Sequence, residues 1–353
     1  MLTFNAWMLA LLLLTFAIME IGCHPTDSVD TNEDMGEKNW TVPPTGQDKC
    51  YDDDSEIPCP GTAGSPSCAS TDFCGQDAQY AATRTFTVTT KRGKNLLEDS
   101  ATGLMWMQEY AKDKTWQEAI DYCDALDYGG HTDWRLPSLI ELWTLTNTSH
   151  SSLIDDTIFS EPSGEDSSYW SFDAWIVSSA SISGHAPHHG PPKVLNILKD
   201  WIFPVRCARN GPLKIGSFEP LVISSYRVVK DLGTGLMWQG CSAGQSGADC
   251  TGDEATRMSW KEALSYCEGL TWAGHDDWRL PNIHELQSIV DYGKGELSLD
   301  FTAFPLAPYN CWSSSSYKYS NSIGHISFNY GYTFASNAQP TDGRYARCVR
   351  SEQ

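Results

Sequence analysis

The chain has 353 residues, 41% of them hydrophobic, and carries 24 Lys and Arg against 45 Asp and Glu, a net charge of −21. This length allows about two domains of ~100–200 residues each, and the hydrophobic content is enough for packed cores, which excludes a wholly disordered chain. The acidic balance argues against nucleic-acid binding, because phosphate recognition needs clustered Lys and Arg.

A short apolar run near the N-terminus predicts export. Residues 9–19 read LALLLLTFAIM, which is too short to span a bilayer comfortably, so residues 1–22 are predicted to be a signal peptide. Gly22 precedes Cys23, as at a bacterial lipoprotein cleavage site, although Glu20 and the lack of a basic residue before Trp7 depart from that pattern. Cys23 is predicted to carry a lipid that is the only membrane attachment, and ordinary cleavage nearby is the alternative. The expected location is the bacterial cell envelope, at the outer surface or in the periplasm, or outside the cell.

Residues 23–79 are predicted to form an acidic linker with small disulfide loops. The stretch 24–60 holds ten acidic and two basic residues and is expected to be extended and solvated, since it cannot bury enough apolar surface to fold. Four close cysteines are expected to pair locally, and a zinc site is the alternative that their spacing disfavours. The predicted pairs are Cys50–Cys59 and Cys68–Cys74.

An internal repeat divides the rest of the chain. Residues 115–145 and 259–289 are identical at 15 of 31 positions without a gap. The sequence TGLMW precedes both segments, and a Trp-Ser pair and an Arg-Cys pair follow both. Twelve extra residues in the second copy include Cys241 and Cys250. We therefore expect two tandem domains, residues 80–212 and 213–353, rather than a solenoid.

Each copy is predicted to have an α+β fold. Apolar residues recur with helical spacing over residues 116–126 and 260–270, and each run begins with a capping box. A second capping box follows each WRLP sequence and predicts a second helix. Short β-type runs are expected to open the copies at residues 85–89 and 226–229 and to close them at residues 201–206 and 345–350.

The remaining cysteines predict three further disulfides. In each copy, one cysteine lies on the buried face of the first helix and another in the closing strand, so a bond would close a long loop worth about 3–5 kcal/mol. A third bond would close the insertion. Cys311 is left over, either as a free thiol beside Trp312 or as a partner for another chain. The predicted pairs are Cys123–Cys207, Cys267–Cys348 and Cys241–Cys250.

These motifs resemble the Lcl C-terminal domain family, a bacterial family of largely unknown function named for a collagen-like adhesin. The resemblance rests on TGLMW, WxEAxxYCxxL, DWRLPxxxEL, WSSS and a closing RCVR, and it covers about residues 80–210 and 220–353. Copy one departs from it, with Trp170-Ser171-Phe172-Asp173 in place of WSSS.

The cysteine-bearing helix and late strand cysteine also resemble C-type-lectin-like folds. This resemblance implies two tandem domains of that fold, each with two helices and a small, mostly antiparallel sheet stapled by a disulfide. It also implies extracellular binding, in some members to glycans or glycosaminoglycans. The calcium motifs of lectins are absent from the sequence, and Glu161-Pro162-Ser163 is interpreted as a turn rather than a calcium site.

No catalytic, phosphate-binding or dinucleotide motif is recognisable, and neither a cofactor nor a metal ion is predicted. His131 and His275, at equal positions in the two copies, are interpreted as loop residues rather than catalytic or metal-binding groups. Arg135 and Arg279 are expected to pair with a nearby acid rather than bind an anion. Three histidines near one another in copy one are interpreted as a surface loop rather than a metal site. These are His185, His188 and His189.

Tyrosines found only in copy two are the candidate binding residues. The tryptophans that repeat between copies are expected in the core, whereas these tyrosines are expected to be exposed and suited to adaptable polar recognition. The candidates are Tyr317, Tyr319, Tyr330 and Tyr332.

Together these features favour an exported, lipid-anchored envelope protein that binds a glycan or a surface protein through its two copies, and not an enzyme. An enzyme on a C-type-lectin-like scaffold, with an unknown substrate, and a structural envelope protein are the alternatives. The acidic surface should repel polyanions. The expected partner is therefore a neutral glycan, a protein or a cation-bridged ligand, with weak heparin binding and no nucleic acid. The oligomeric state is left open.

Overall fold

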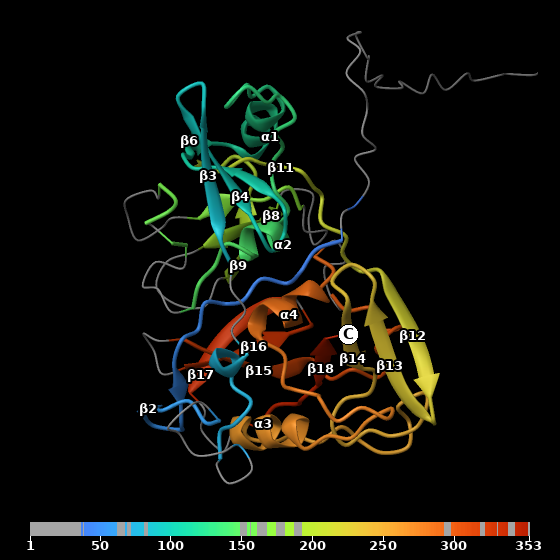
Figure 1. The fold of residues 1–353 in the computed structure, drawn as a ribbon. Helices are drawn as coiled ribbons and strands as arrows, with labels where there is room; N and C mark the ends of the chain where they lie inside the picture. The colour runs from blue at the N-terminus through green and yellow to red at the C-terminus, as the bar shows by residue number, and fades with distance from the viewer. Residues whose placement is uncertain are drawn as a thin grey trace, which may run out of the picture. The chain divides into compact units, whose positions relative to one another are not determined.

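The two copies each combine two short helices with small antiparallel sheets (Figure 1). The computed structural model describes residues 37, 39–61, 68, 72–80, 84–148, 154–155, 157–160, 168–173, 181–186, 193–292, 298–317, 322–329, 331–337 and 343–351. None of the helices in these ranges is long and apolar enough to cross a membrane. Both copies lie within one compact unit, residues 35–353.

All four predicted helices begin where the capping boxes place them. At each start the first residue's side chain accepts a hydrogen bond from the backbone N–H three residues on, and a glutamate there accepts one in return. This exchange satisfies N–H groups that have no partner within the helix. The helices are α1 (Trp116–Asp124) and α2 (Leu139–Trp143) in copy one, and α3 (Trp260–Glu268) and α4 (Ile283–Ser288) in copy two.

A four-stranded antiparallel sheet forms part of each copy. Its strand order is β11-β5-β4-β3 in copy one and β12-β13-β14-β18 in copy two. The strands of copy one are β3 (Phe86–Lys91), β4 (Lys94–Asp99), β5 (Met105–Met107) and β11 (Ala208–Arg209). Those of copy two are β12 (Phe218–Ile223), β13 (Tyr226–Asp231), β14 (Leu236–Gln239) and β18 (Val349–Ser351).

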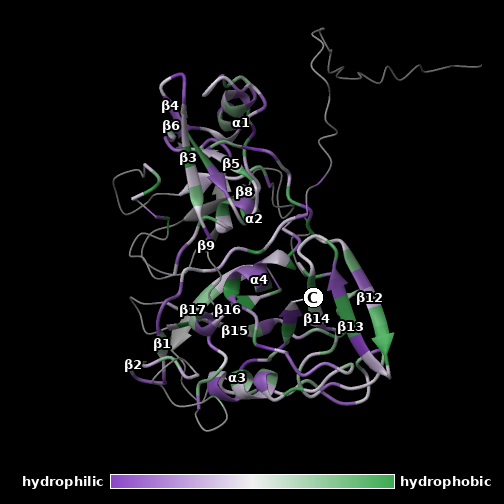
Figure 2. Ribbon diagram, viewed as in Figure 1, coloured by the Kyte–Doolittle hydropathy of each residue, from purple (hydrophilic) through white to green (hydrophobic). Residues whose placement is uncertain are grey.

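The predicted opening strands prove not to be equivalent. Residues 85–89 fall mainly in β3, an edge strand, whereas residues 226–229 fall in β13, the second strand of its sheet. The prediction missed β4 and β12. β12 is an edge strand and buries little surface, so its apolar pattern does not reveal its place in the sheet. Figure 2 shows the hydrophobic end of β12, where Val222 is 53% exposed.

Smaller sheets complete the two copies. A three-stranded sheet of copy one has the order β7-β8-β9, and its counterpart in copy two has the order β15-β16-β17. Their strands are β7 (Tyr169–Trp170), β8 (Ser181–Ala186), β9 (Lys193–Leu198), β15 (Asn310–Tyr317), β16 (Ser322–Ser327) and β17 (Tyr332–Asn337). The closing region of copy one adds a pair, β6 (Ala111–Lys114) with β10 (Phe203–Val205).

All five predicted cysteine pairs lie at disulfide distance, with Cα–Cα separations from 4.9 to 5.7 Å. Two of them join the first helix of a copy to its closing segment, as predicted. Cys311 is a free thiol that is only 1% exposed. A bond to another chain would require the core around it to open, and burial raises the pKa of this thiol to about 11.

Each copy buries an arginine immediately before the cysteine of its closing segment. Arg206 donates to the carbonyl oxygens of Met107 (3.0 Å) and Gln108 (2.7 Å). Arg347 donates to those of Gln239 (2.7 Å) and Gly240 (2.6 Å) in the same way. Both side chains are 0% exposed. A buried charge is tolerated only when it is well hydrogen-bonded, so these contacts fix the chain that follows β5 and β14.

One hydrophobic core contains residues of both copies. It includes Trp106 and Trp143 from copy one, Trp238 and Leu286 from copy two, and Trp40 from the N-terminal segment. The two sequence repeats are therefore two copies of one fold that share packed side chains. This sharing makes the stability of one copy depend on the presence of the other.

The segment 39–49, here called the strap, runs between the copies. The backbone N–H of Trp40 donates to Gly233 of copy two (2.9 Å), and that of Thr41 donates to Ala101 of copy one (3.2 Å). Trp40 is 6% exposed, and its indole N–H donates to the carbonyl oxygen of Lys214 (3.1 Å). The expectation that residues 24–60 are solvated is wrong for the strap. Residues 39–47 read NWTVPPTGQ and contain no acid, which the average over the longer acidic stretch concealed.

After the strap comes the leader, residues 50–80, whose described residues dock on copy two although they precede copy one in the chain. The leader holds the strands β1 (Cys50–Tyr51) and β2 (Glu56–Ile57) and the 3₁₀ helix η2 (Asp77–Gln79). Buried Asp77 accepts hydrogen bonds from the hydroxyls of Thr45 and Ser315 (2.7 Å to Ser315). The Ser315 hydroxyl oxygen accepts from the N–H of Ile283 at the start of α4 (3.0 Å).

In copy one, a residue of the copy itself accepts the corresponding hydrogen bond at the start of its second helix. The carboxylate of Asp173 accepts directly from the N–H of Leu139 at the start of α2. Burial raises the pKa of Asp173 to about 6. The difference between WSFD and WSSS is therefore structural, since the leader supplies to copy two the carboxylate that copy one contains.

His284 lies where the strap and the two copies meet. It is 3% exposed, with Nδ1 3.0 Å from the carbonyl oxygen of Pro43 and Nε2 2.8 Å from the hydroxyl oxygen of Thr146. A carbonyl oxygen only accepts, so Nδ1 carries a proton. Burial is the main cause that lowers the pKa of His284 to about 4.

Replacing Trp40 by Ala should lower the free energy of unfolding by about 3–5 kcal/mol, because it empties a site in the shared core. Denaturant unfolding should show one transition that moves for both copies together. The matched control is Trp201→Ala, since Trp201 is 54% exposed, and its cost should stay under about 1 kcal/mol. A Trp40→Ala protein as stable as the control would show that the strap does not hold the copies.

The pH dependence of stability should report His284. An unfolded histidine has a pKa near 6.5, so between pH 6.5 and 4 the unfolded chain binds more protons and stability falls as the pH falls. The contribution of neutral His284 to the free energy of unfolding is complete above pH 6.5, and about 3 kcal/mol of it is lost by pH 4. Denaturant unfolding of His284→Gln across this range should show a correspondingly flatter profile than the unsubstituted protein. Identical profiles would contradict the assignment.

Candidate functional site

A cavity of about 410 Å³ opens beside the β15–β17 sheet of copy two. Its volume lies within the ~300–1,000 Å³ range of small-molecule sites. We call it the arginine pocket. Its side chains come from β15, β16, β17, the segment before α3 and the segment before β18. They are Arg257, Asn310, His325, Phe334, Arg344 and Tyr345.

One wall of the arginine pocket is a ladder of aromatic rings. Strand register places His325 opposite Trp312 on one side and opposite Phe334 on the other. The His325 and Phe334 rings are stacked, with centroids 5.5 Å apart and planes inclined by 19°. The Trp312 ring meets His325 edge-on at 5.8 Å. Phe334 is 43% exposed, so the ladder presents a flat aromatic face to a ligand.

Two guanidinium groups form the other wall. The backbone of Arg344 pairs with that of Met258, and its guanidinium lies 4.5 Å from the centre of the Trp312 ring. Arg257 precedes Met258, and its Nε donates to the hydroxyl of Tyr345 (3.3 Å). Among the described residues that line the pocket, none is acidic. The net −21 protein therefore concentrates positive charge at this point.

His325 is a buried polar group within this wall. It is 5% exposed, and its Nδ1 has no hydrogen-bond partner among the described residues. Burial, helped by the nearby charge of Arg344, lowers the pKa of His325 to about 3. The ring is therefore neutral at pH 7.

Copy one has different residues at the two arginine positions. The indole N–H of Trp170 donates to Lys114 (2.6 Å), and that of Trp312 donates to Met258 (2.9 Å), which makes Lys114 and Met258 equivalent. The residue before Lys114 is Asp113, and the strand partner of Lys114 is Phe203. Arg257 and Arg344 thus correspond to an acid and an apolar ring. The pair of arginines belongs to copy two alone.

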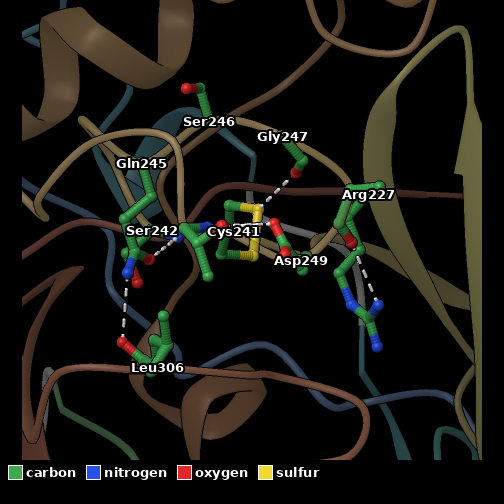
Figure 3. The surroundings of a disulfide bond; sticks show 12 residues. Arg227, Cys241, Ser242, Gln245, Ser246, Gly247, Asp249 and Leu306 are labelled. Atoms are coloured by element: carbon green, nitrogen blue, oxygen red, sulfur yellow. Dashed lines mark hydrogen bonds between the residues drawn. A yellow bond between two sulfur atoms is a disulfide. The ribbon is translucent and has the colours of Figure 1, made fainter.

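The 12-residue insertion surrounds a disulfide (Figure 3) and lines a second cavity that shares Tyr345 with the arginine pocket. The Cys241–Cys250 disulfide closes it, and Gln245 donates to the carbonyl oxygen of Leu306 (3.2 Å). Arg227 donates to the carbonyl oxygen of Ala248 (3.2 Å). The second cavity, about 530 Å³ in volume and here called the acidic hollow, is lined by Gln245, Thr251, Asp253, Glu254, Leu306, Pro308 and Tyr345. Tyr345 lines both cavities, so a positive and a negative site adjoin.

A family model described as the Lcl C-terminal domain matches residues 95–207 and 227–350. The chain belongs to the Lcl C-terminal domain family. The two matched regions correspond to the two copies and agree with tandem α+β domains. A search of the curated proteins found no match.

Copy two does not expose Tyr317 as expected. Tyr317 ends β15 and is only 4% exposed, so its expected exposure is wrong. The serine-rich strand looks polar but is buried, since the leader and strap bind it through Asp77 and Gln47. Tyr332 is half-buried, with its ring 6.1 Å from that of Phe334. Tyr319 and Tyr330 lie outside the described residues.

The repeated polar residues of the Lcl C-terminal copies are structural. Arg135 forms a bidentate pair with Glu141 (2.7 Å for both bonds), as predicted. Arg279 and Glu285 repeat it at 2.7 and 2.5 Å. His131 closes a loop through backbone bonds to Tyr128. Asp133 and Asp277, which follow the repeated histidines, pair with Arg209 and Arg350.

Several predicted features cannot be placed. Residues 1–22, Cys23, His188, His189 and 161–163 lie outside the described residues, and the side chain of His185 on β8 is likewise not described. Within the described ranges, no three potential metal ligands gather.

Sequence reasoning missed Arg257, Phe334 and Arg344. A signal for the two arginines was available in the repeat itself, because aligning the copies puts Asp113 and Phe203 at their positions. The residues that the two copies share are structural. The candidate site is found instead at positions where the two copies carry different residues.

Removing the insertion's disulfide should cost less stability than removing a copy's main disulfide. Cys241→Ser with Cys250→Ser releases a loop of separation 9, worth about 2–3 kcal/mol. Cys123→Ser with Cys207→Ser releases a loop of separation 84, worth about 4–5 kcal/mol. Denaturant unfolding of the two double variants checks this order. Equal losses would mean that the insertion is part of the main folding core.

Proposed function

We propose that this Lcl C-terminal domain protein is an exported, lipid-anchored envelope protein that binds a glycan or a surface protein. In this proposal the arginine pocket of copy two is the contact site. The observation that carries it is the half-exposed Phe334 face beside two guanidinium groups in a cavity of ligand size. Flat aromatic surface and a few fixed polar groups are typical of binding sites. The proposal assigns no catalytic step to the pocket.

The disulfides support the exported location in this proposal. Five cysteine pairs at bonding distance are typical of an oxidising compartment. The signal peptide at residues 1–22 and the lipid at Cys23 complete the proposal. A tethered protein of this kind would carry its binding face away from the membrane surface.

The shared core supports different roles for the two copies. Copy one lacks the two arginines, so the copies do not supply two equal sites and simple avidity between them is not expected. Copy one instead packs against copy two through the strap and the shared core. In this proposal copy one acts as a rigid support for the site in copy two.

The test uses the mature chain on a glycan array and in pull-downs with surface proteins. The proposal expects at least one ligand, bound about tenfold more weakly by Phe334→Ala, because ring contact is worth about 1 kcal/mol or more. The matched control is Phe172→Ala in copy one, since Phe172 is 58% exposed, and it should leave binding unchanged. If the folded protein binds nothing on either platform, the proposed function is wrong.

A further inference from the structure

We infer that the arginine pocket binds a terminal, carboxylate-bearing sugar of a glycan, with the sugar ring on Phe334 and the carboxylate between Arg257 and Arg344. This inference rests on the proposed binding function and names its ligand class. It differs from the neutral glycan that the overall charge favours, because the local charge at this pocket is positive.

The shape of the pocket favours a ring over a side chain. Phe334 is 43% exposed and stacks almost parallel on buried His325, so its ring offers a flat platform rather than an enclosed socket. A pyranose ring has a flat face of C–H groups that gains hydrophobic contact on such a platform. An apolar peptide side chain gains more from a socket that surrounds it. The volume of about 410 Å³ suits one or two sugar units.

The two arginines select the charged group. A guanidinium is planar and offers paired donors that match the two oxygens of a carboxylate. Arg344 is held over Trp312 and Arg257 is held against Tyr345, so both groups are positioned before a ligand arrives. Little conformational entropy is then lost when they bind.

The surroundings limit the ligand to a single negative charge. The acidic hollow adjoins the pocket across Tyr345 and presents Asp253 and Glu254. A polyanionic chain would bring further negative groups against these acids and against a protein of net charge −21. A charge at the end of a glycan avoids that repulsion. The pocket therefore favours a terminal acidic sugar over a sulfated or repeating acidic chain.

The experiment titrates the mature chain with methyl β-D-glucuronide and with methyl β-D-glucoside, which differ only in the carboxylate. The glucuronide should bind at least tenfold more tightly. Arg257→Gln should weaken the glucuronide about tenfold and leave the glucoside unchanged. The matched control Arg92→Gln removes an equal charge from an exposed site of copy one and should change neither. Equal binding of the two sugars, or an unaffected Arg257→Gln, would overturn the inference.

Two further probes distinguish the proposed acidic sugar from a peptide carboxylate and from a polyanion. Acetyl-glycyl-phenylalanine carries a peptide carboxylate beside a ring, and heparin carries many charges. Tighter binding of either one than of the glucuronide, lost in Arg257→Gln, would assign the pocket to that class and overturn the inference. If an array ligand is bound equally by the unsubstituted protein and Arg257→Gln, the inference fails while the binding function stands. If no ligand is found on the array or in the pull-downs, both the inference and the proposed binding function are wrong.

Discussion

The burial of the strap between the two copies is the constraint on which the rest of the structure depends. Trp40 packs into a core built from both copies, and its backbone bonds to copy two while Thr41 bonds to copy one. The leader that follows the strap is thereby brought to copy two, where Asp77 reaches Ser315 behind α4. That docking covers the serine-rich strand β15. The aromatic ladder beside the arginine pocket still presents Phe334 to solvent.

Duplication explains both the likeness and the difference of the copies. Each needs the same internal anchors to hold its loops, namely a buried arginine, a helix-to-strand disulfide and a bidentate Arg–Glu pair. These groups are all bonded to other groups of the protein, so they serve the fold. The positions of Arg257 and Arg344 hold Asp113 and Phe203 in copy one. The Phe203 ring packs on Trp170 (4.9 Å), much as the Arg344 guanidinium lies over Trp312 in copy two, so the packing is kept while the chemistry differs.

Much of the fold could be read from short-range patterns. Capping boxes located all four helices because the Thr115–Glu118 type of exchange is made within three residues. Cysteine spacing and the repeat located the five disulfides. The binding residues could not be found this way. Tyr317 was expected at the surface because it is found only in copy two, yet Asp77 and Gln47, more than 230 residues away along the chain, bind that strand.

The amino-acid sequence by itself determined the duplication, the α+β class, the helix starts and the disulfide pairs, since each is encoded by local spacing or by comparison of one copy with the other. Only the tertiary structure decided that the acidic N-terminal stretch contains a packed strap and that the leader belongs to copy two. It also decided that Arg257, Arg344 and Phe334 share one pocket. The physical reason is that burial and charge clustering depend on which distant segments meet, and no local pattern records those meetings.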